Sequence, residues 1–89
     1  MKIKIILFGN CKDIFKSSNV HINFEKKIRV KDIRSKLIEI IKKKHSTNKS
    51  YEDLIKKSAF CSEQNEIVND SYILKKDKVI SIIPPIGGG

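Results

Sequence analysis

The spacing of apolar residues changes period once along this chain, and the change limits the elements that it can form. In residues 2–8 apolar side chains first alternate with lysines and then fill both faces, which predicts a strand entering the interior of a sheet. The polar residues 10–19 predict a turn, and residues 20–25 alternate again. From Val30 the apolar residues recur every three or four positions, which predicts a helix. A β-hairpin followed by a helix is therefore expected.

The second half of the chain predicts shorter elements. Leu54 and Ile55 lie among charged residues and indicate one or two helical turns. Residues 59–61 and 66–68 are expected to form short strands, and residues 79–83 a β-branched strand. This order suits an α+β fold, in which a mixed sheet folds over one main helix and the first and last strands lie parallel at its centre.

The size of the chain directs function to the surface or to an end. A domain of 89 residues buries only about 60% of the surface of its unfolded chain, too little for a deep, enclosed active site. The net charge is +9, but seventeen of the 19 basic residues are lysines and isoleucine is equally numerous, which indicates a compositional bias more than a designed binding groove. The lysines at 42–44 are interpreted as the solvated end of the helix.

The sequence shows no pattern typical of a disulfide framework, a metal site or a catalytic side-chain group. Cys11 and Cys61 are fifty positions apart and form no disulfide or zinc pattern, so a reducing, cytosolic setting is expected. His21 and His45 stand alone and are interpreted as ordinary surface residues, which leaves no metal site. Cys61 paired with a histidine is a conceivable nucleophile, but core packing is the preferred interpretation. No apolar run approaches the roughly 20 residues that cross a bilayer, so a soluble protein without a membrane partner is expected.

The last six residues have a composition that suggests a mechanical role. We expect residues 1–83 to form the domain and residues 84–89 a flexible tail. Prolines cannot donate hydrogen bonds to a strand partner, so they end the strand and direct the chain outward. Glycines lack Cβ and can pass through a narrow channel. The tail consists of Pro84, Pro85, Ile86, Gly87, Gly88 and Gly89. From composition alone, a frayed end without function is an equal alternative.

Residues 83–89 resemble the end of the small subunit of molybdopterin synthase, a sulfur carrier among the ubiquitin-like β-grasp proteins. Further matches follow the family's order: an opening strand reaching Leu7 and Phe8, a helix start at residues 30–33, and residues 74–79 before the last strand. The resemblance covers nearly the whole chain, and its most specific part is the tail. It implies the β-grasp fold.

The resemblance also implies a reaction at Gly89. In this family an E1-like enzyme uses ATP to adenylate the terminal carboxylate, and a sulfur donor converts the adenylate to a thiocarboxylate. The large synthase subunit then uses this sulfur to convert precursor Z, the cyclic pyranopterin monophosphate, into molybdopterin. The chain would be a non-catalytic sulfur-donor subunit in a heterotetramer of two small and two large subunits, with no permanently bound cofactor.

Three further apolar residues match positions where this family contacts its partners. These are Phe8, Ile67 and Ile83, for which core packing is an equal alternative. Three positions depart from the family pattern, one of them Gly87, where a small Ser, Ala or Thr is commoner. Lys76 stands at a turn position where glycine is usual, and Arg29 replaces a helix-capping threonine or serine, so a strained or altered turn and a weaker cap are expected.

Other functions remain open at this stage. A sulfur carrier of thiamine synthesis, or a ubiquitin-related modifier for tRNA thiolation, would share the fold and the glycine end, although the two prolines favour the molybdopterin branch. A basic nucleic-acid-binding module, using the lysines at 42–44, belongs to another class and would show strongly salt-dependent binding. It is disfavoured because aromatic side chains for base stacking are few.

Overall fold

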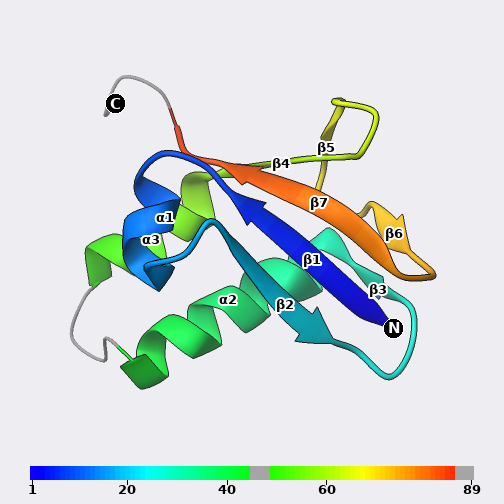
Figure 1. The fold of residues 1–89 in the computed structure, drawn as a ribbon, viewed down its shortest axis with the longest axis horizontal. Helices are drawn as coiled ribbons and strands as arrows, with labels where there is room; N and C mark the ends of the chain where they lie inside the picture. Colours follow the sequence, from blue (N-terminus) through cyan, green and yellow to red (C-terminus); the bar gives the residue numbers. More distant parts are fainter. Residues whose placement is uncertain (45–48, 86–89) are drawn as a thin grey trace.

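The computed structural model describes residues 1–44 and 49–85. These residues form a five-stranded sheet in the order β2-β1-β7-β4-β5, a two-stranded ribbon β3-β6, and three helices (Figure 1). In chain order the elements are β1 (Lys2–Leu7), α1 (Asn10–Phe15), β2 (Asn19–Asn23), β3 (Ile28–Arg29), α2 (Val30–Lys44), α3 (Lys49–Lys57), β4 (Ala59–Cys61), β5 (Ile67–Val68), β6 (Ile73–Leu74) and β7 (Lys78–Ile83).

The centre of the sheet is the pair formed by the first and last strands. β1 and β7 run parallel, with Ile5 opposite Ile80 and Leu7 opposite Ile82. β2 flanks β1 and β4 flanks β7, both in antiparallel orientation. β7 is therefore hydrogen-bonded on both sides. The predicted α+β architecture, a mixed sheet with these two strands central and parallel, is confirmed.

One face of this sheet packs against α2, which lies across it in Figure 1. Ile33, Leu37 and Ile41 of α2 are fully buried, and their spacing of four residues places them on one side of the helix. They join the inward residues of β1 and β7 in a single core cluster. The helical spacing seen in the sequence is thus the stripe that closes the core. In the described part of the chain, no helix is long and apolar enough to span a membrane.

The start of α2 is capped by an acidic residue in its first turn. The Arg29 N–H donates to Asp32 Oδ2 at 2.8 Å, which is the arrangement of the acidic partner in a capping box. The next two N–H groups, of Val30 and Lys31, donate to the Tyr72 and Asp70 carbonyls, each at 3.0 Å. Asp32 and the loop before β6 thus satisfy donors at this helix start, and the weaker cap expected from Arg29 stays a prediction.

Several local predictions need correction. Residues 10–15, expected to be part of a turn, form α1, a helix of six residues that buries Cys11 and Ile14 one turn apart. α3 is longer than the one or two turns predicted. The two-residue strands β3 and β6 were not predicted. Outside the glycines, the described residues with positive φ are Lys16 and Asn65, so the turn containing Lys76 takes a shape without a left-handed residue there.

Arg34 of α2 links three other parts of the fold. Its Nη1 donates to the Ile55 carbonyl at 2.6 Å and to the Ser58 carbonyl at 2.8 Å, at the end of α3 and the start of β4. Its Nη2 lies 2.8 Å from Asp70 Oδ1, and its guanidinium stacks 4.9 Å from the centre of the Phe60 ring. One planar side chain thereby fixes α3 and β4 against α2.

Candidate functional site at the end of the last strand

The site begins where β7 leaves the sheet. β7 ends at Ile83, which lies opposite Ala59 of β4, and two prolines follow it. Pro84 is half-buried and Pro85 is exposed. Because β7 is paired with β1 up to Ile82 and with β4 up to Ile83, the point at which the chain leaves the sheet is fixed. The strand ends where the prolines predicted that it would.

Gly9 supports this exit from the other end of the chain. It lies two residues after the end of β1 and has φ 53° and ψ −134°, a backbone conformation suited to glycine. A Cβ built on Gly9 would be 3.0 Å from Pro84 Cγ. Only a residue without a side chain lets the β1–α1 connection pass this closely beside Pro84. Gly9 is a site residue that no local sequence pattern indicated, since its contact lies far along the chain.

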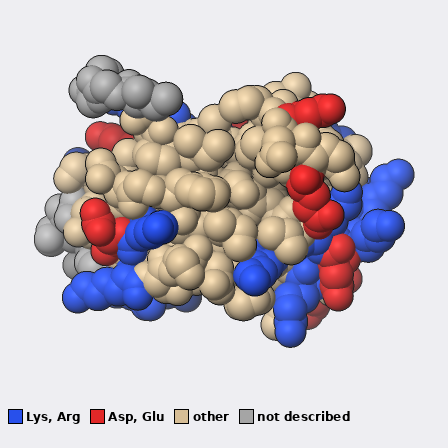
Figure 2. Space-filling model, turned by 45° about the horizontal axis from the view of Figure 1, so that its top comes forward, with Lys and Arg blue, Asp and Glu red and all other residues tan. Residues whose placement is uncertain are grey.

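On the face of the sheet opposite α2, the surroundings of the end of β7 are uncharged, whereas Lys4 lies opposite Val79 near its start. On β7 the buried residues Ile80 and Ile82 alternate with Val79, Ser81 and Ile83, which lie on the other side. Ser81 is opposite Ile6 of β1 and Cys61 of β4, so these three share this face. We call this side of the sheet the open face. Figure 2 shows a broad area without charged side chains, with lysines and acidic residues at its borders.

Two of the three predicted interface residues are clearly exposed. Phe8 is 46% exposed and Ile67 is 70% exposed, so core packing is the wrong interpretation for both. Ile83 is half-buried. Phe8 directly follows Leu7, which lies opposite Ile82, so Phe8 is near the exit of β7. Ile67 lies on β5 opposite Cys61, two strands from β7. Phe8 and Ile83 are therefore close, and Ile67 is further across the sheet. The interface role of all three remains a prediction.

The remaining predicted residues of the tail lie outside the described residues, as does His45. They are Ile86, Gly87, Gly88 and Gly89. The last described residues before them are Pro84 and Pro85.

Comparison with known proteins identifies the fold. No family model and no curated protein matches the sequence. Solved structures match over the full length: SAMP1 from Haloferax volcanii has a TM-score of 0.71 at 15% identity, covering 100% of both chains. SAMP1 from Methanosarcina acetivorans, the small archaeal modifier protein 1, has a TM-score of 0.66 at 22% identity, covering 99% of this chain and 96% of that one.

A third match is a protein of Pyrococcus furiosus that is provisionally assigned as molybdopterin converting factor, subunit 1. Its TM-score is 0.65 at 21% identity, and the alignment covers 97% of this chain and 99% of that one. This chain has the ubiquitin-like β-grasp fold. At these identities the similarity establishes the architecture, and the expected fold is confirmed.

The cysteines and His21 of this β-grasp domain form no reactive group. Cys11 is buried, its Sγ lies 3.8 Å from Ser58 Oγ, and burial raises the pKa of its thiol, which disfavours the nucleophilic thiolate. Cys61 is half-buried on the open face, so its predicted place in the core is wrong. His21 is exposed on β2, as predicted. Across residues 1–44 and 49–85, no group of three His, Cys, Asp or Glu side chains is placed to hold a metal ion.

Proposed function

We propose that this chain is a sulfur carrier whose reacting group is the carboxylate of Gly89. The observation that carries the proposal is the position of the exit. The central strand β7 leads out at Pro84 beside an open face with exposed apolar residues, in a fold shared with small modifier proteins and a molybdopterin converting factor subunit. A β-grasp domain of 89 residues, a size that leaves little room for a deep enclosed active site, suits a carried substrate better than an enzyme.

The proposed reaction has two steps. In the first, a Gly89 carboxylate oxygen attacks the α-phosphorus of ATP, pyrophosphate leaves, and an acyl adenylate forms. In the second, a sulfide-level nucleophile attacks the acyl carbon, the C–O bond to AMP breaks, and the thiocarboxylate is released with AMP. A carboxylate is a poor acceptor for nucleophiles, and AMP provides the leaving group that it lacks. An E1-like enzyme would supply the ATP site.

The geometry of the exit sets how the tail meets its partners. Pro84 is packed beside Gly9, and beyond Pro85 four residues remain. Four residues span at most about 14 Å when fully extended. A partner that acts on Gly89 must therefore contact the region around Phe8 and Ile83 while the tail enters its active site. Tail residues without bulky side chains can enter a narrow channel.

For the partner we propose the large subunit of molybdopterin synthase, with two copies of each subunit in the assembly. The large subunit would hold the catalytic groups, and the thiocarboxylate would supply sulfur to precursor Z. The similarity to the molybdopterin converting factor subunit of Pyrococcus furiosus supports this branch. Exposed Phe8 and Ile67 provide the apolar contact that such an interface needs.

A second candidate function is protein modification. It is favoured by the two structural neighbours named SAMP1, one of them described as a modifier protein. The activation at Gly89 would be the same, but a lysine amine of a target protein would attack the acyl carbon of the adenylate, the C–O bond to AMP would break, and an amide would form with release of AMP and a proton. The two functions differ in the product, because a modifier stays attached to its target whereas a carrier is released with its sulfur removed.

Activation can be tested by ATP–pyrophosphate exchange with a candidate E1-like enzyme. The intact chain is expected to stimulate exchange of labelled pyrophosphate into ATP. Deletion of Gly89 is expected to reduce the exchange rate more than a hundred-fold, with an unchanged circular dichroism spectrum, because no core residue is removed. A matched control, Ser35→Ala on the exposed side of α2, is expected to leave exchange unchanged. Equal exchange with and without Gly89 would overturn the proposal.

A further inference from the structure

Four lysines gather at one end of the β3–β6 ribbon. The antiparallel register places Ile28 opposite Leu74 and Arg29 opposite Ile73. The two residues before Ile28 and the two after Leu74 therefore extend from the same end of the ribbon. All four are exposed lysines: Lys26, Lys27, Lys75 and Lys76. We call this group the lysine end.

Positive charge exceeds negative charge at the lysine end. Within the described ranges, none of the four lysines forms an ion pair. Of the acidic residues near them in sequence, Asp77 accepts a hydrogen bond from the Lys2 N–H at 2.7 Å and Asp32 accepts one from the Arg29 N–H, and a carboxylate that accepts a hydrogen bond keeps its charge. With Glu25 these are three negative charges, fewer than the positive charges gathered here.

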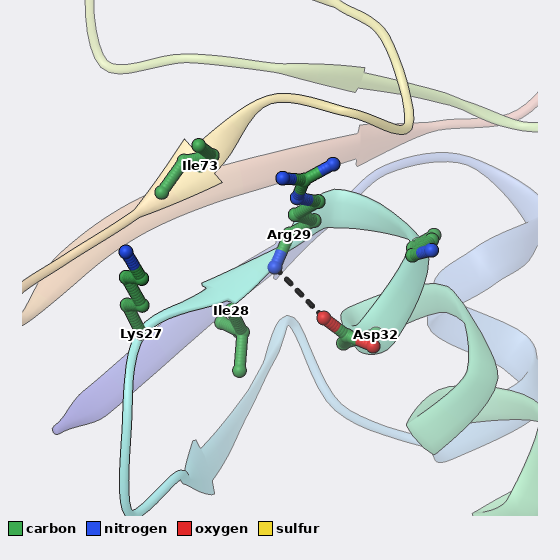
Figure 3. Close-up of a pocket in the computed structure, with 6 residues that line it drawn as sticks. Lys27, Ile28, Arg29, Asp32 and Ile73 are labelled. Carbon is green, nitrogen blue, oxygen red and sulfur yellow. Dashed lines mark hydrogen bonds between the residues drawn. The ribbon is translucent and has the colours of Figure 1, made fainter.

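A cavity of about 190 Å³ adjoins the lysine end and carries more positive charge. Its lining combines Lys27, Arg29 and Lys31 with Asp32 and the apolar residues Ile28 and Ile73. In Figure 3, Lys27, which directly precedes β3, and Arg29 of β3 lie on either side of Ile73 of β6, while Asp32 is turned to the Arg29 backbone. With the four lysines, six cationic side chains thus border one small area.

We propose that the lysine end and this cavity bind the phosphate backbone of a nucleic acid, without reading its bases. Protein interfaces are depleted in lysine and enriched in aromatic residues at their centres, whereas phosphate contacts are made by Lys and Arg. The exposed apolar side chain here is Ile73, and no exposed aromatic ring lies among the residues that line the cavity. The composition therefore suits a polyanion better than an acidic protein.

This surface is separate from the proposed carrier site. β7 starts at Lys78 near the lysine end and finishes at Ile83 near the exit, a span of about 17 Å at the usual rise of a strand. Figure 1 shows β3 and β6 at one end of the molecule and the chain's last described residues at the other. A bound nucleic acid would leave Phe8 and Ile83 free.

The structure also makes the lysines at 42–44 a weaker candidate for the same role. Lys42 Nζ lies 4.0 Å from Glu52, and Lys43 Nζ lies 3.6 Å from Glu39. Two of these three lysines thus form an ion pair, which none of the four lysines at the lysine end does in the described part of the chain. The location of the charge favours the ribbon over the helix end that the sequence suggested.

The test compares two variants that lose the same charge. One replaces Lys26, Lys27, Lys75 and Lys76 with Gln. The control replaces Lys12, Lys44, Lys56 and Lys57 with Gln, and these also are exposed lysines without an ion pair in the structure. Binding of a labelled 20-nucleotide RNA and of a 20-base-pair DNA is measured by fluorescence anisotropy between 20 and 200 mM salt. Circular dichroism verifies that both variants are folded.

For the ribbon variant we expect affinity at low salt to fall at least ten-fold. The slope of log K against log salt should drop by about 3 to 4 on duplex DNA, because each phosphate contact contributes about 0.9. The control should retain the wild-type slope within about 1. The RNA and DNA arms show which backbone is preferred. Equal losses in both variants, absence of salt-dependent binding, or equally tight binding of polyglutamate would each overturn the proposal. The assay uses neither ATP nor sulfur, so its result is independent of the carrier proposal.

Discussion

Replacement of Gly9 with alanine tests the support of the tail exit. The change places a Cβ 3.0 Å from Pro84 Cγ and forces alanine into φ 53° and ψ −134°. Backbone conformations of this kind cost a residue other than glycine about 1–3 kcal/mol. We therefore expect Gly9→Ala to lower the free energy of unfolding by about 2 kcal/mol, which corresponds to a fall in Tm of roughly 8–16 °C for a domain of this size.

Urea denaturation followed by circular dichroism measures this change, and a double-mutant cycle separates its two causes. Pro84→Ala removes the Cγ that the new Cβ would meet but leaves the backbone of Gly9 unchanged. In the Pro84→Ala background, Gly9→Ala should cost about 0.5–1 kcal/mol less than in the wild type, since neighbouring residues couple by such amounts. A cost below about 0.5 kcal/mol in the wild type, typical of a neutral surface change, would refute the strained geometry. Equal costs in both backgrounds would refute the contact with Pro84.

Three further predictions concern stability and partner binding. Arg34→Lys keeps the charge but loses the planar set of donors to Ile55 and Ser58, so we expect the free energy of unfolding, measured by urea denaturation, to fall by about 2–3 kcal/mol. An unchanged urea midpoint would contradict the linking role of Arg34. Phe8→Asp and Ile67→Asp alter exposed positions, so each should change the free energy of unfolding by no more than about 0.5 kcal/mol. Both substitutions should nevertheless weaken binding to the large synthase subunit more than ten-fold, as measured by calorimetry. Unchanged affinity in both variants would show that the open face is not part of the interface. Burial raises the pKa of the Cys11 thiol, so the folded state holds this proton more tightly than the unfolded state, and stability should fall as pH rises above the usual thiol pKa of about 8.5. Cys11→Ala should reduce this slope between pH 8 and 9.5 in parallel urea titrations, and an identical slope in both proteins would argue against the burial effect.

The sequence predicted the helices and strands that are long enough for the apolar pattern to repeat several times. β1 and β7 each have six residues with buried side chains at alternate positions, and the stripe on α2 repeats along 15 residues. α1 was missed because six residues show only one repeat, Cys11 and Ile14. β3 and β6 were missed because two residues have no period at all, and their pairing depends on a partner about 45 residues away along the chain.

Only the part of the candidate site that depends on local sequence patterns was predicted. Composition indicated the tail and its two prolines, since the effect of proline on a strand is local. The contact between Gly9 and Pro84 joins opposite ends of the chain, and the hydrogen bonds of Arg34 reach across three elements. Such contacts arise only when the sheet has assembled, so no local pattern reveals them. The lysine end likewise follows from the pairing of β3 with β6.

The central claim is that Gly89 carries sulfur, and the intact mass of the chain tests it most directly. The protein is incubated with ATP, a sulfur donor and an E1-like enzyme, and its mass is measured before and after digestion to locate any change. The account predicts replacement of one oxygen by one sulfur, confined to Gly89. An unchanged mass in the presence of several active adenylating enzymes, or sulfur located elsewhere in the chain, would contradict it.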